Sequence, residues 1–489
     1  MTNSERLHRG EITLSSSTST SPGSQDMPPA AMPPIPASTV REDDSETYII
    51  SDGVKVVERY FTLPLDYACP EGPKIRVFAR NMMSAEKAKT AEEQAELPYL
   101  VYLQGGPGFE CDMGSVSGVA AEIHKHGYQT LWLDQRGTGL STPLSAEVLE
   151  GKNDAEIANY CKHFRADNIV RDCEAIREIL LGHKEDLEER KWTIMGQSFG
   201  GFCSFTYLSF YPDSLKEVFI TGGIAPLLLD DPVGNYEATS KRVVERNKIY
   251  YEKYPQDIKR VRVILRYLET NTVTLPNGGR LSVKRFQMLG IGFGMKGGID
   301  DVHQLVLRAT NDLEVHGKLT YNLLNRVQES HSFDQNPIYC ILHEPIYCSG
   351  KPAKWAASRV LASKPQFLWT EIKDQNDEPV YFTGEMILPE MLDDFVNLRP
   401  LKGAAQLLAD FEDWPALYDR ERLAKNTVKV TAATYYSDMY VPFDLAQDVV
   451  EAVPNIEQWI TNQHFHSALR NDTKGVIDTL FRLSKRERD

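Results

Sequence analysis

The stretch Trp192-Thr193-Ile194-Met195-Gly196-Gln197-Ser198-Phe199-Gly200 joins an apolar, β-prone run to a helix-compatible segment from Gly201 to Tyr211. Its last five residues fit the pattern G-x-S-x-G, which places a serine on a sharp turn between a strand and a helix. The turn needs glycines because it strains the serine backbone and leaves no room for neighbouring Cβ atoms. The stretch therefore predicts that Ser198 is a nucleophile, with the Phe199 N–H beside it to stabilise an oxyanion.

Other strand-like segments precede this stretch. Four short β-rich runs at hairpin spacing and then two buried-strand candidates occur at Tyr48–Ile50, Lys55–Val57, Tyr60–Leu63, Ile75–Phe78, Tyr99–Leu103 and Gln129–Leu133. Apolar residues at helical spacing predict a helix from Asn168 to Leu181. This alternation indicates an α/β protein with a mostly parallel, doubly wound sheet that opens with antiparallel strands.

The pattern changes after Pro226, where residues to about 410 read as helices and loops. Strand-like runs return at Val428–Ala433 and Ile456–Ile460. We therefore predict a core in two parts, 45–226 and 411–489, with a mainly helical cap, 227–410, inserted between strands. Residues 1–44 are rich in Ser, Thr, Pro and Met, so we expect a disordered tail.

The composition is that of an acidic globular protein. Of 489 residues, 42% are hydrophobic and 25% are charged, and the formal net charge is −15. This charge argues against nucleic acid or an anionic membrane as a partner, because phosphate groups would be repelled. The sequence contains no apolar run of about 18 residues and no signal-peptide core. Seven cysteines without a short-spaced framework fit reduced thiols, so we expect a cytoplasmic protein.

A serine nucleophile on such a turn needs a carboxylate and a histidine, which follow it in the order Ser, Asp or Glu, His. Asp438 and His466 each follow one of the strand-like runs near the C-terminus. His464 competes for the role of base, and we prefer His466 because a helix begins directly after it. A metal pair made by the two histidines is the alternative. Since no cluster of Cys, Asp or Glu supports such a pair, we expect neither a metal nor a cofactor.

The second oxyanion donor is predicted in the glycine-rich turn Gln104-Gly105-Gly106-Pro107-Gly108, which follows the run Tyr99–Leu103. Consecutive glycines let main-chain N–H groups approach a ligand closely, and Pro107 stiffens the turn. We therefore expect Gly105, Gly106 and Phe199 to form an oxyanion hole.

Three other residues near these motifs are expected to have structural roles. Asp134 and Arg136 are predicted to form a buried ion pair that braces a loop near the active face. Cys203 lies one helical turn beyond Ser198, and we expect it to be a small buried hydrophobe.

Three glycine-containing blocks together resemble the proline iminopeptidases, which are serine peptidases of the α/β-hydrolase superfamily. The blocks are Gly105–Gly108, Asp134–Ser141 and Gly196–Gly201. The resemblance runs from about residue 48 to 475 and includes Leu342–Cys348 and Phe382–Met386, which look like cap segments of the larger fungal and actinobacterial branch. It implies an α/β-hydrolase fold with a helical cap.

The same resemblance implies an activity: release of an N-terminal residue, preferably proline, from small peptides with a free N-terminus. It implies that Ser198 is the nucleophile, that Asp438 orients and that His466 is the base. Glutamates in the family's cap hold the charged amine of the substrate, and the matching positions here are Glu344 and Glu385. Association into a homo-oligomer stays open.

The chain departs from the family at Gln104, where many members have His. The oxyanion donors of this loop are main-chain groups, so the change leaves them in place and alters the anchoring of the loop. The main alternative function is that of an esterase or lactonase acting on a small natural-product ester with the same three residues. A non-enzymatic interaction protein is a weaker alternative, because such chains usually lack one or more of the three.

Overall fold

A mixed sheet forms the centre of the core. The computed structural model describes residues 36–43, 45–50, 53–375 and 377–486, and its strands follow the order β1-β3-β4-β6-β5-β7-β8-β9-β10, with β2 paired to β3. Pairing is antiparallel from β1 to β6 and parallel from β6 through β5, β7, β8 and β9 to β10. The strands are β1 Arg41–Glu42, β2 Glu46–Ile50, β3 Val54–Pro64, β4 Lys74–Ser84, β5 Tyr99–Leu103, β6 Gln129–Asp134, β7 Trp192–Gln197, β8 Leu215–Thr221, β9 Lys429–Tyr435 and β10 Ile456–Thr461. The predicted α/β-hydrolase sheet is confirmed.

Three details of the sheet differ from the prediction. The runs Lys55–Val57 and Tyr60–Leu63 belong to one strand, β3. Strand β1 falls inside the expected tail, because Arg41 and Glu42 pair with Thr62 and Phe61 of β3; residues 1–35 and 44 lie outside the described residues. Strand β8, which lies between β7 and β9 in the sheet, was not predicted.

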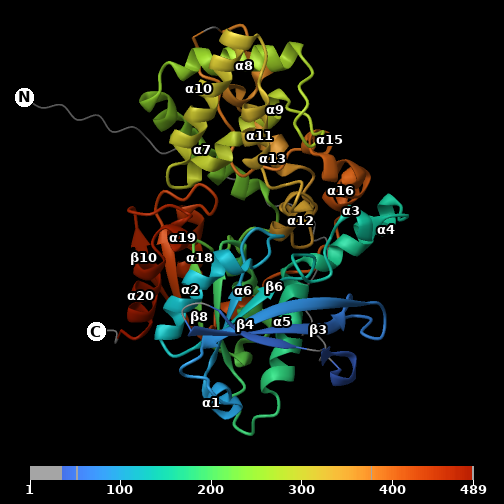
Figure 1. Cartoon of the computed structure of the whole chain (residues 1–489), viewed down its shortest axis with the longest axis vertical. Helices are drawn as coiled ribbons and strands as arrows, with labels where there is room; N and C mark the ends of the chain where they lie inside the picture. Colours follow the sequence, from blue (N-terminus) through green and yellow to red (C-terminus); the bar gives the residue numbers. More distant parts are fainter. Residues whose placement is uncertain (1–35, 44, 51–52, 376, 487–489) are drawn as a thin grey trace, which may run out of the picture. The chain divides into compact units, whose positions relative to one another are not determined.

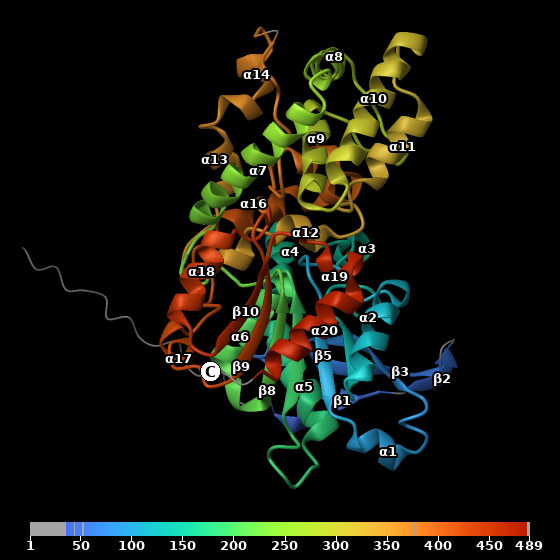
Figure 2. The same cartoon turned by 90° about the vertical axis from the view of Figure 1, so that its left-hand side faces the viewer.

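Helices cover both faces of the sheet, as Figures 1 and 2 show. On one face, α5 and α6 pack with α18 against residues such as Val101 and Ile194. On the other face, α2 and α20 pack against Leu100 and Met195. Neighbouring residues of one strand thus enter different apolar clusters, because side chains alternate across a strand. The core helices are α1 Ala91–Glu96, α2 Met113–Lys125, α3 Ala146–Leu149, α4 Asp154–Cys161, α5 Ala166–Leu181, α6 Phe199–Phe210, α17 Arg420–Leu423, α18 Phe443–Ala452, α19 Ala468–Asn471 and α20 Thr473–Ser484.

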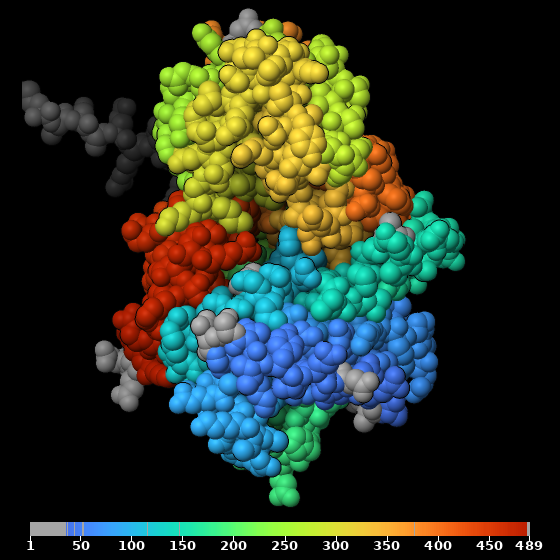
Figure 3. Space-filling view, in the orientation of Figure 1, coloured from blue at the N-terminus to red at the C-terminus, as the bar shows by residue number. Residues whose placement is uncertain are grey.

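The chain between β8 and β9 forms a helical cap, drawn in green to orange in Figures 1 and 3. Its helices are α7 Val233–Lys253, α8 Asp257–Thr270, α9 Val283–Gln287, α10 Gly298–His316, α11 Tyr321–Glu329, α12 Pro337–Ile341, α13 Ala356–Leu361, α14 Trp369–Ile372, α15 Met391–Asp394 and α16 Lys402–Asp410. The apolar cluster of the cap also contains Leu149, Ile157 and Phe164 from the segment before α5, and Tyr440 from the loop after β9. The cap is thus packed onto the core by shared apolar side chains rather than joined by linkers alone.

Candidate active site

Ser198 occupies a strained turn between β7 and α6. Its φ is 54° and its ψ is −121°, in the region that non-glycine residues rarely adopt. The surrounding glycines have no space for a side chain: a Cβ at Gly200 would lie 1.9 Å from the Leu103 carbonyl oxygen, and one at Gly201 would lie 2.2 Å from that of Gly223. The Ser198 N–H donates to the Thr221 carbonyl at 3.0 Å. Close packing of β5, β7, β8 and α6 therefore fixes the turn.

Asp438 and His466 form a hydrogen-bonded pair at the ends of the last two strands. His466 Nδ1 lies 2.8 Å from Asp438 Oδ2, while Asp438 Oδ1 accepts from the Tyr440 and Val441 N–H groups at 2.8 and 3.1 Å. Burial alone would lower the pKa of His466, but the charge and hydrogen bond of Asp438, followed by the charge of Glu385, bring the net pKa above its usual value. The carboxylate is thus held by the backbone and faces a single ring nitrogen.

Ser198 and His466 line the same pocket, whose volume is about 940 Å³. Two glycines after β8 pack closely against these residues. A Cβ at Gly222 would lie 3.2 Å from His466 Nδ1, and one at Gly223 would lie 2.4 Å from the Ser198 carbonyl oxygen. His464, by contrast, lies 3.8 Å from Asp472 and packs edge-on to Trp459. The structure therefore brings His466, and not His464, to the pocket of Ser198.

The predicted oxyanion residues also meet at this pocket. Phe199 is the first residue of α6, and Gly105 and Gly106 line the pocket. A Cβ at Gly105 would lie 3.1 Å from the Ser198 Cβ, so this glycine packs directly against the serine. In this conformation the Gly105 N–H donates to Gln104 Oε1 at 2.9 Å.

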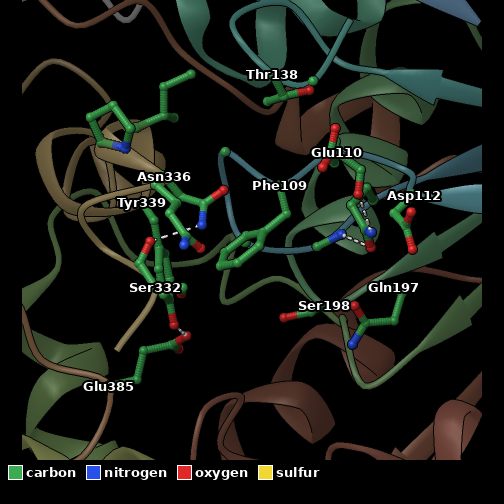
Figure 4. Close-up of a pocket in the computed structure, with 18 of the residues that line it drawn as sticks. Phe109, Glu110, Asp112, Thr138, Gln197, Ser198, Ser332, Asn336, Tyr339 and Glu385 are labelled. Carbon is green, nitrogen blue, oxygen red and sulfur yellow. Dashed lines mark hydrogen bonds between the residues drawn. The ribbon is translucent and has the colours of Figure 1, made fainter. Parts of the chain in front are cut away.

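Glu385 enters the same pocket from the cap (Figure 4). One carboxylate oxygen accepts from the Tyr339 hydroxyl at 2.5 Å, and the other lies 3.5 Å from His343 Nε2. Burial alone would raise the pKa of Glu385, but the charge and hydrogen bond of His343 and the bond from Tyr339 bring the net pKa below its usual value. Glu385 thus lines the pocket, and the direction of its pKa favours the ionised carboxylate at neutral pH.

Glu344 has a different position from the one expected for an amine-binding residue. Its oxygens accept from the N–H groups of Ala356 and Ala357 at 3.0 and 2.9 Å, which are the first two residues of α13. Its side chain is buried, and burial raises its pKa to about 7. Both oxygens are occupied by the start of a helix, and the pocket lining includes Glu385 but not Glu344. The geometry therefore does not support a direct contact between Glu344 and a substrate amine.

Several pocket residues were not found from the sequence. Phe109 follows the glycine loop and packs edge-on against Tyr339 of the cap, with ring centroids 5.0 Å apart, as Figure 4 shows. Tyr440, two residues after Asp438, packs edge-on to the His466 ring at 4.7 Å. A large aromatic residue next to a predicted catalytic loop was an available signal in both cases. Tyr339 had no such signal, because the cap helix that carries it has no motif.

The residues expected to be structural are buried, but one predicted pairing is wrong. Arg136 pairs with Asp172 of α5, at 2.7 and 2.6 Å, and not with Asp134. Asp134 accepts instead from the N–H groups of Cys111 and Leu140 at 2.7 and 2.9 Å. Cys203 is fully buried, as expected.

The described residues contain neither a metal-binding cluster nor a candidate membrane span. In this part of the chain, no group of three or more His, Cys, Asp or Glu side chains is arranged to hold a metal ion. The described helices also include none with the length and apolar character of a membrane span.

A sheet of this order, with a serine on a strained strand-to-helix turn, defines the class of the α/β-hydrolases. A family model described as "alpha/beta hydrolase fold" matches residues 98–265. A proline iminopeptidase of Aeromonas sobria is 41% identical over 443 residues, which are 90% of this chain and 99% of the relative. One of Aspergillus aculeatus is 39% identical over 426 residues, 87% of this chain and 92% of the relative. The chain therefore belongs to the proline iminopeptidase family.

The similarity to solved structures is more distant. The crystal structure of a proline iminopeptidase from Mycobacterium smegmatis aligns with 86% of this chain and 98% of its own chain, at 14% identity and a TM-score of 0.40.

Proposed function

We propose that this protein is a serine aminopeptidase that releases the N-terminal residue, preferably proline, from small peptides. The observation that carries the proposal is the position of the Glu385 carboxyl group, in the pocket that also holds Ser198 and His466; its lowered pKa favours the charged form. An aminopeptidase must bind a free α-amine, whose unperturbed pKa is about 7.7–8.0. A carboxylate beside the reacting bond favours the protonated amine and disfavours a blocked N-terminus.

Each of these residues has a defined role in the reaction. His466 accepts the Ser198 proton as the hydroxyl oxygen attacks the carbonyl carbon of the first residue, and Asp438 orients the ring and stabilises its charged form. The N–H groups of Phe199 and of the loop Gly105–Gly106 stabilise the oxyanion. The peptide C–N bond then breaks as His466 protonates the leaving amine. Water, activated by the same histidine, attacks the acyl-enzyme and releases the free amino acid.

Apolar side chains in the pocket suit a small first residue such as proline. Phe109, Ile338, Tyr339 and Tyr440 line it together with Glu385. A saturated ring buried against these groups removes apolar surface from water, while its nitrogen can still face the carboxylate.

The experiment that tests the proposal compares proline arylamide, N-acetylproline arylamide and a short-chain aryl ester as substrates of the wild-type enzyme. We expect efficient hydrolysis of the free arylamide and very poor hydrolysis of the acetylated one. Equal cleavage of the two arylamides, or a clear preference for the ester, would instead favour the esterase alternative.

The state of the cysteines is informative about the cellular compartment of the protein. All seven are free thiols, and six of them are buried. This supports the inference of a reducing compartment such as the cytoplasm.

A further inference from the structure

The Gly105 N–H already has an acceptor within the protein. Gln104 Oε1 accepts from it at 2.9 Å, and Gln104 Nε2 donates to the Glu110 carbonyl at 2.9 Å. The second bond determines the orientation of the amide, because a carbonyl oxygen can only accept a hydrogen bond. The amide oxygen must therefore face the Gly105 N–H.

This hydrogen bond lies at the reaction centre. Gln104, Gly105 and Ser198 line one pocket, and Gly105 packs against the Ser198 Cβ. The Gln104 main chain is held separately, because its carbonyl accepts from Gln135 Nε2 at 3.2 Å. The Gln104 side chain can thus turn away without moving the Gly105 backbone.

An N–H group directs its hydrogen toward one acceptor, and the bond weakens steeply when the angle departs from linear. The Gly105 N–H therefore cannot make full-strength bonds to Gln104 and to an oxyanion at the same time. We propose that Gln104 is a positioning residue that occupies the Gly105 N–H in the free enzyme and releases it to the oxyanion as the tetrahedral intermediate forms. This inference rests on the proposed function, because it takes Gly105 as an oxyanion donor.

Transfer of the Gly105 hydrogen bond from Gln104 to the oxyanion stabilises the transition state more than the bound substrate. A neutral substrate carbonyl competes with the neutral Gln104 amide on nearly equal terms, whereas hydrogen bonds to a charged oxygen are roughly twice as strong. The Gly105 donor therefore contributes little until negative charge develops on the substrate oxygen. Interactions of this kind raise kcat rather than lower KM.

Three variants separate this role from simple support of the loop. Gln104→Glu keeps an acceptor beside Gly105 and adds a negative charge, so we expect kcat/KM for proline arylamide to fall by about 10²–10³-fold, the scale of one oxyanion donor. Gln104→Ala removes the competing acceptor and the bond to Glu110, and we expect a lower KM with kcat/KM within about tenfold of wild type. Gln335→Glu makes the same charge change elsewhere in the pocket lining and should have a much smaller effect than Gln104→Glu.

The opposite ranking would overturn the inference. If Gln104 only ties the loop to Glu110, Gln104→Ala loses at least as much activity as Gln104→Glu, because both variants lack the Nε2 donor. Thermal unfolding of each variant identifies losses that are due to misfolding. If Gln104→Glu misfolds, the structure of an inhibited wild-type enzyme tests the inference instead.

That structure is of wild-type enzyme treated with prolyl boronic acid, which forms a tetrahedral adduct on the Ser198 oxygen. We expect a boronate oxygen on the Gly105 N–H and the Gln104 side chain turned away. An adduct in which Gln104 still accepts from Gly105 would overturn the inference while leaving the proposed function intact. Absence of both an adduct and hydrolysis of proline arylamide would overturn both.

Discussion

At the scale of single residues, turnover depends on which side chains exchange protons with the substrate. Ser198 is presented by a backbone with φ of 54°, and His466 faces Asp438 at 2.8 Å. The pair needs no rearrangement of the carboxylate, because the backbone N–H groups of Tyr440 and Val441 already fix it.

Removing the nucleophile or the base should abolish turnover. Ser198→Ala is expected to lower kcat by about 10⁶-fold, and His466→Ala by nearly as much, the scale known for serine triads. His464→Ala is the matched control and should be mild, because that ring packs on Trp459. The check is steady-state kinetics on purified variants with unchanged thermal unfolding. More than a few per cent residual activity in Ser198→Ala, or a larger loss in His464→Ala than in His466→Ala, would refute the assignments.

The loss of activity on the acid side of the pH profile, its acid limb, should reflect protonation of His466. The base must be neutral to accept a proton, and its pKa is raised above 6.5 despite burial, by Asp438 and then by Glu385. Activity is therefore expected to fall as the pH drops through a value above 6.5. Glu385→Gln removes one of the charges that raise this pKa, so the limb should move to lower pH. Measuring kcat/KM with a neutral ester avoids titration of a substrate amine, and a limb that stays in place or moves upward would contradict the coupling.

At this scale the sequence predicts local features better than distant ones. Ser198 and its glycines could be placed because the turn is encoded within five residues. The partner of Arg136 could not, since Asp172 lies 36 positions away and only packing of α5 brings it close. The contacts of Glu344 could not be predicted for the same reason: its hydrogen-bond donors are N–H groups of α13, a helix whose start no local motif marks.

At the scale of elements, Glu344 organises the start of α13. Its carboxylate satisfies two N–H groups that a helix leaves without internal partners. We expect Glu344→Ala to lower the free energy of unfolding by about 1–3 kcal/mol, as measured by denaturant titration. Glu371→Ala, in the first turn of α14, is the control and should change stability by less than about 0.5 kcal/mol. A variant that keeps its stability but loses as much kcat/KM as Glu385→Gln would return Glu344 to the amine site.

Strand β8 shows why one element was missed. Its first residues include the exposed Lys216 and the partly buried Glu217, which accepts from the Tyr128 hydroxyl at 2.9 Å. Only Val218–Thr221 form a continuous buried run, which is short for a strand signal. Strands β5 and β6 are buried along their whole length. They could be predicted correctly because strands covered on both faces carry short continuous apolar segments, here Tyr99–Leu103 and Leu131–Leu133.

At the scale of the whole molecule, the site is assembled from distant parts of the chain. The core supplies Ser198 and His466, and the cap supplies Glu385 and Tyr339 to the same pocket. Sequence could predict that a cap exists from the change of pattern after Pro226. It could not predict which of the two cap glutamates lines the pocket, because that depends on how helices without motifs pack.

The most direct measurement is the effect of Glu385→Gln on the ratio of kcat/KM for proline arylamide to kcat/KM for N-acetylproline arylamide. The substitution keeps shape and removes charge. Loss of a desolvated charge pair costs about 2–5 kcal/mol, so the rate for the free amine should fall by about 30-fold to several thousandfold, while the rate for the acetylated substrate stays nearly constant. The ratio should therefore collapse. An unchanged ratio in a folded variant that still hydrolyses both substrates would contradict the claim that Glu385 recognises the N-terminal amine.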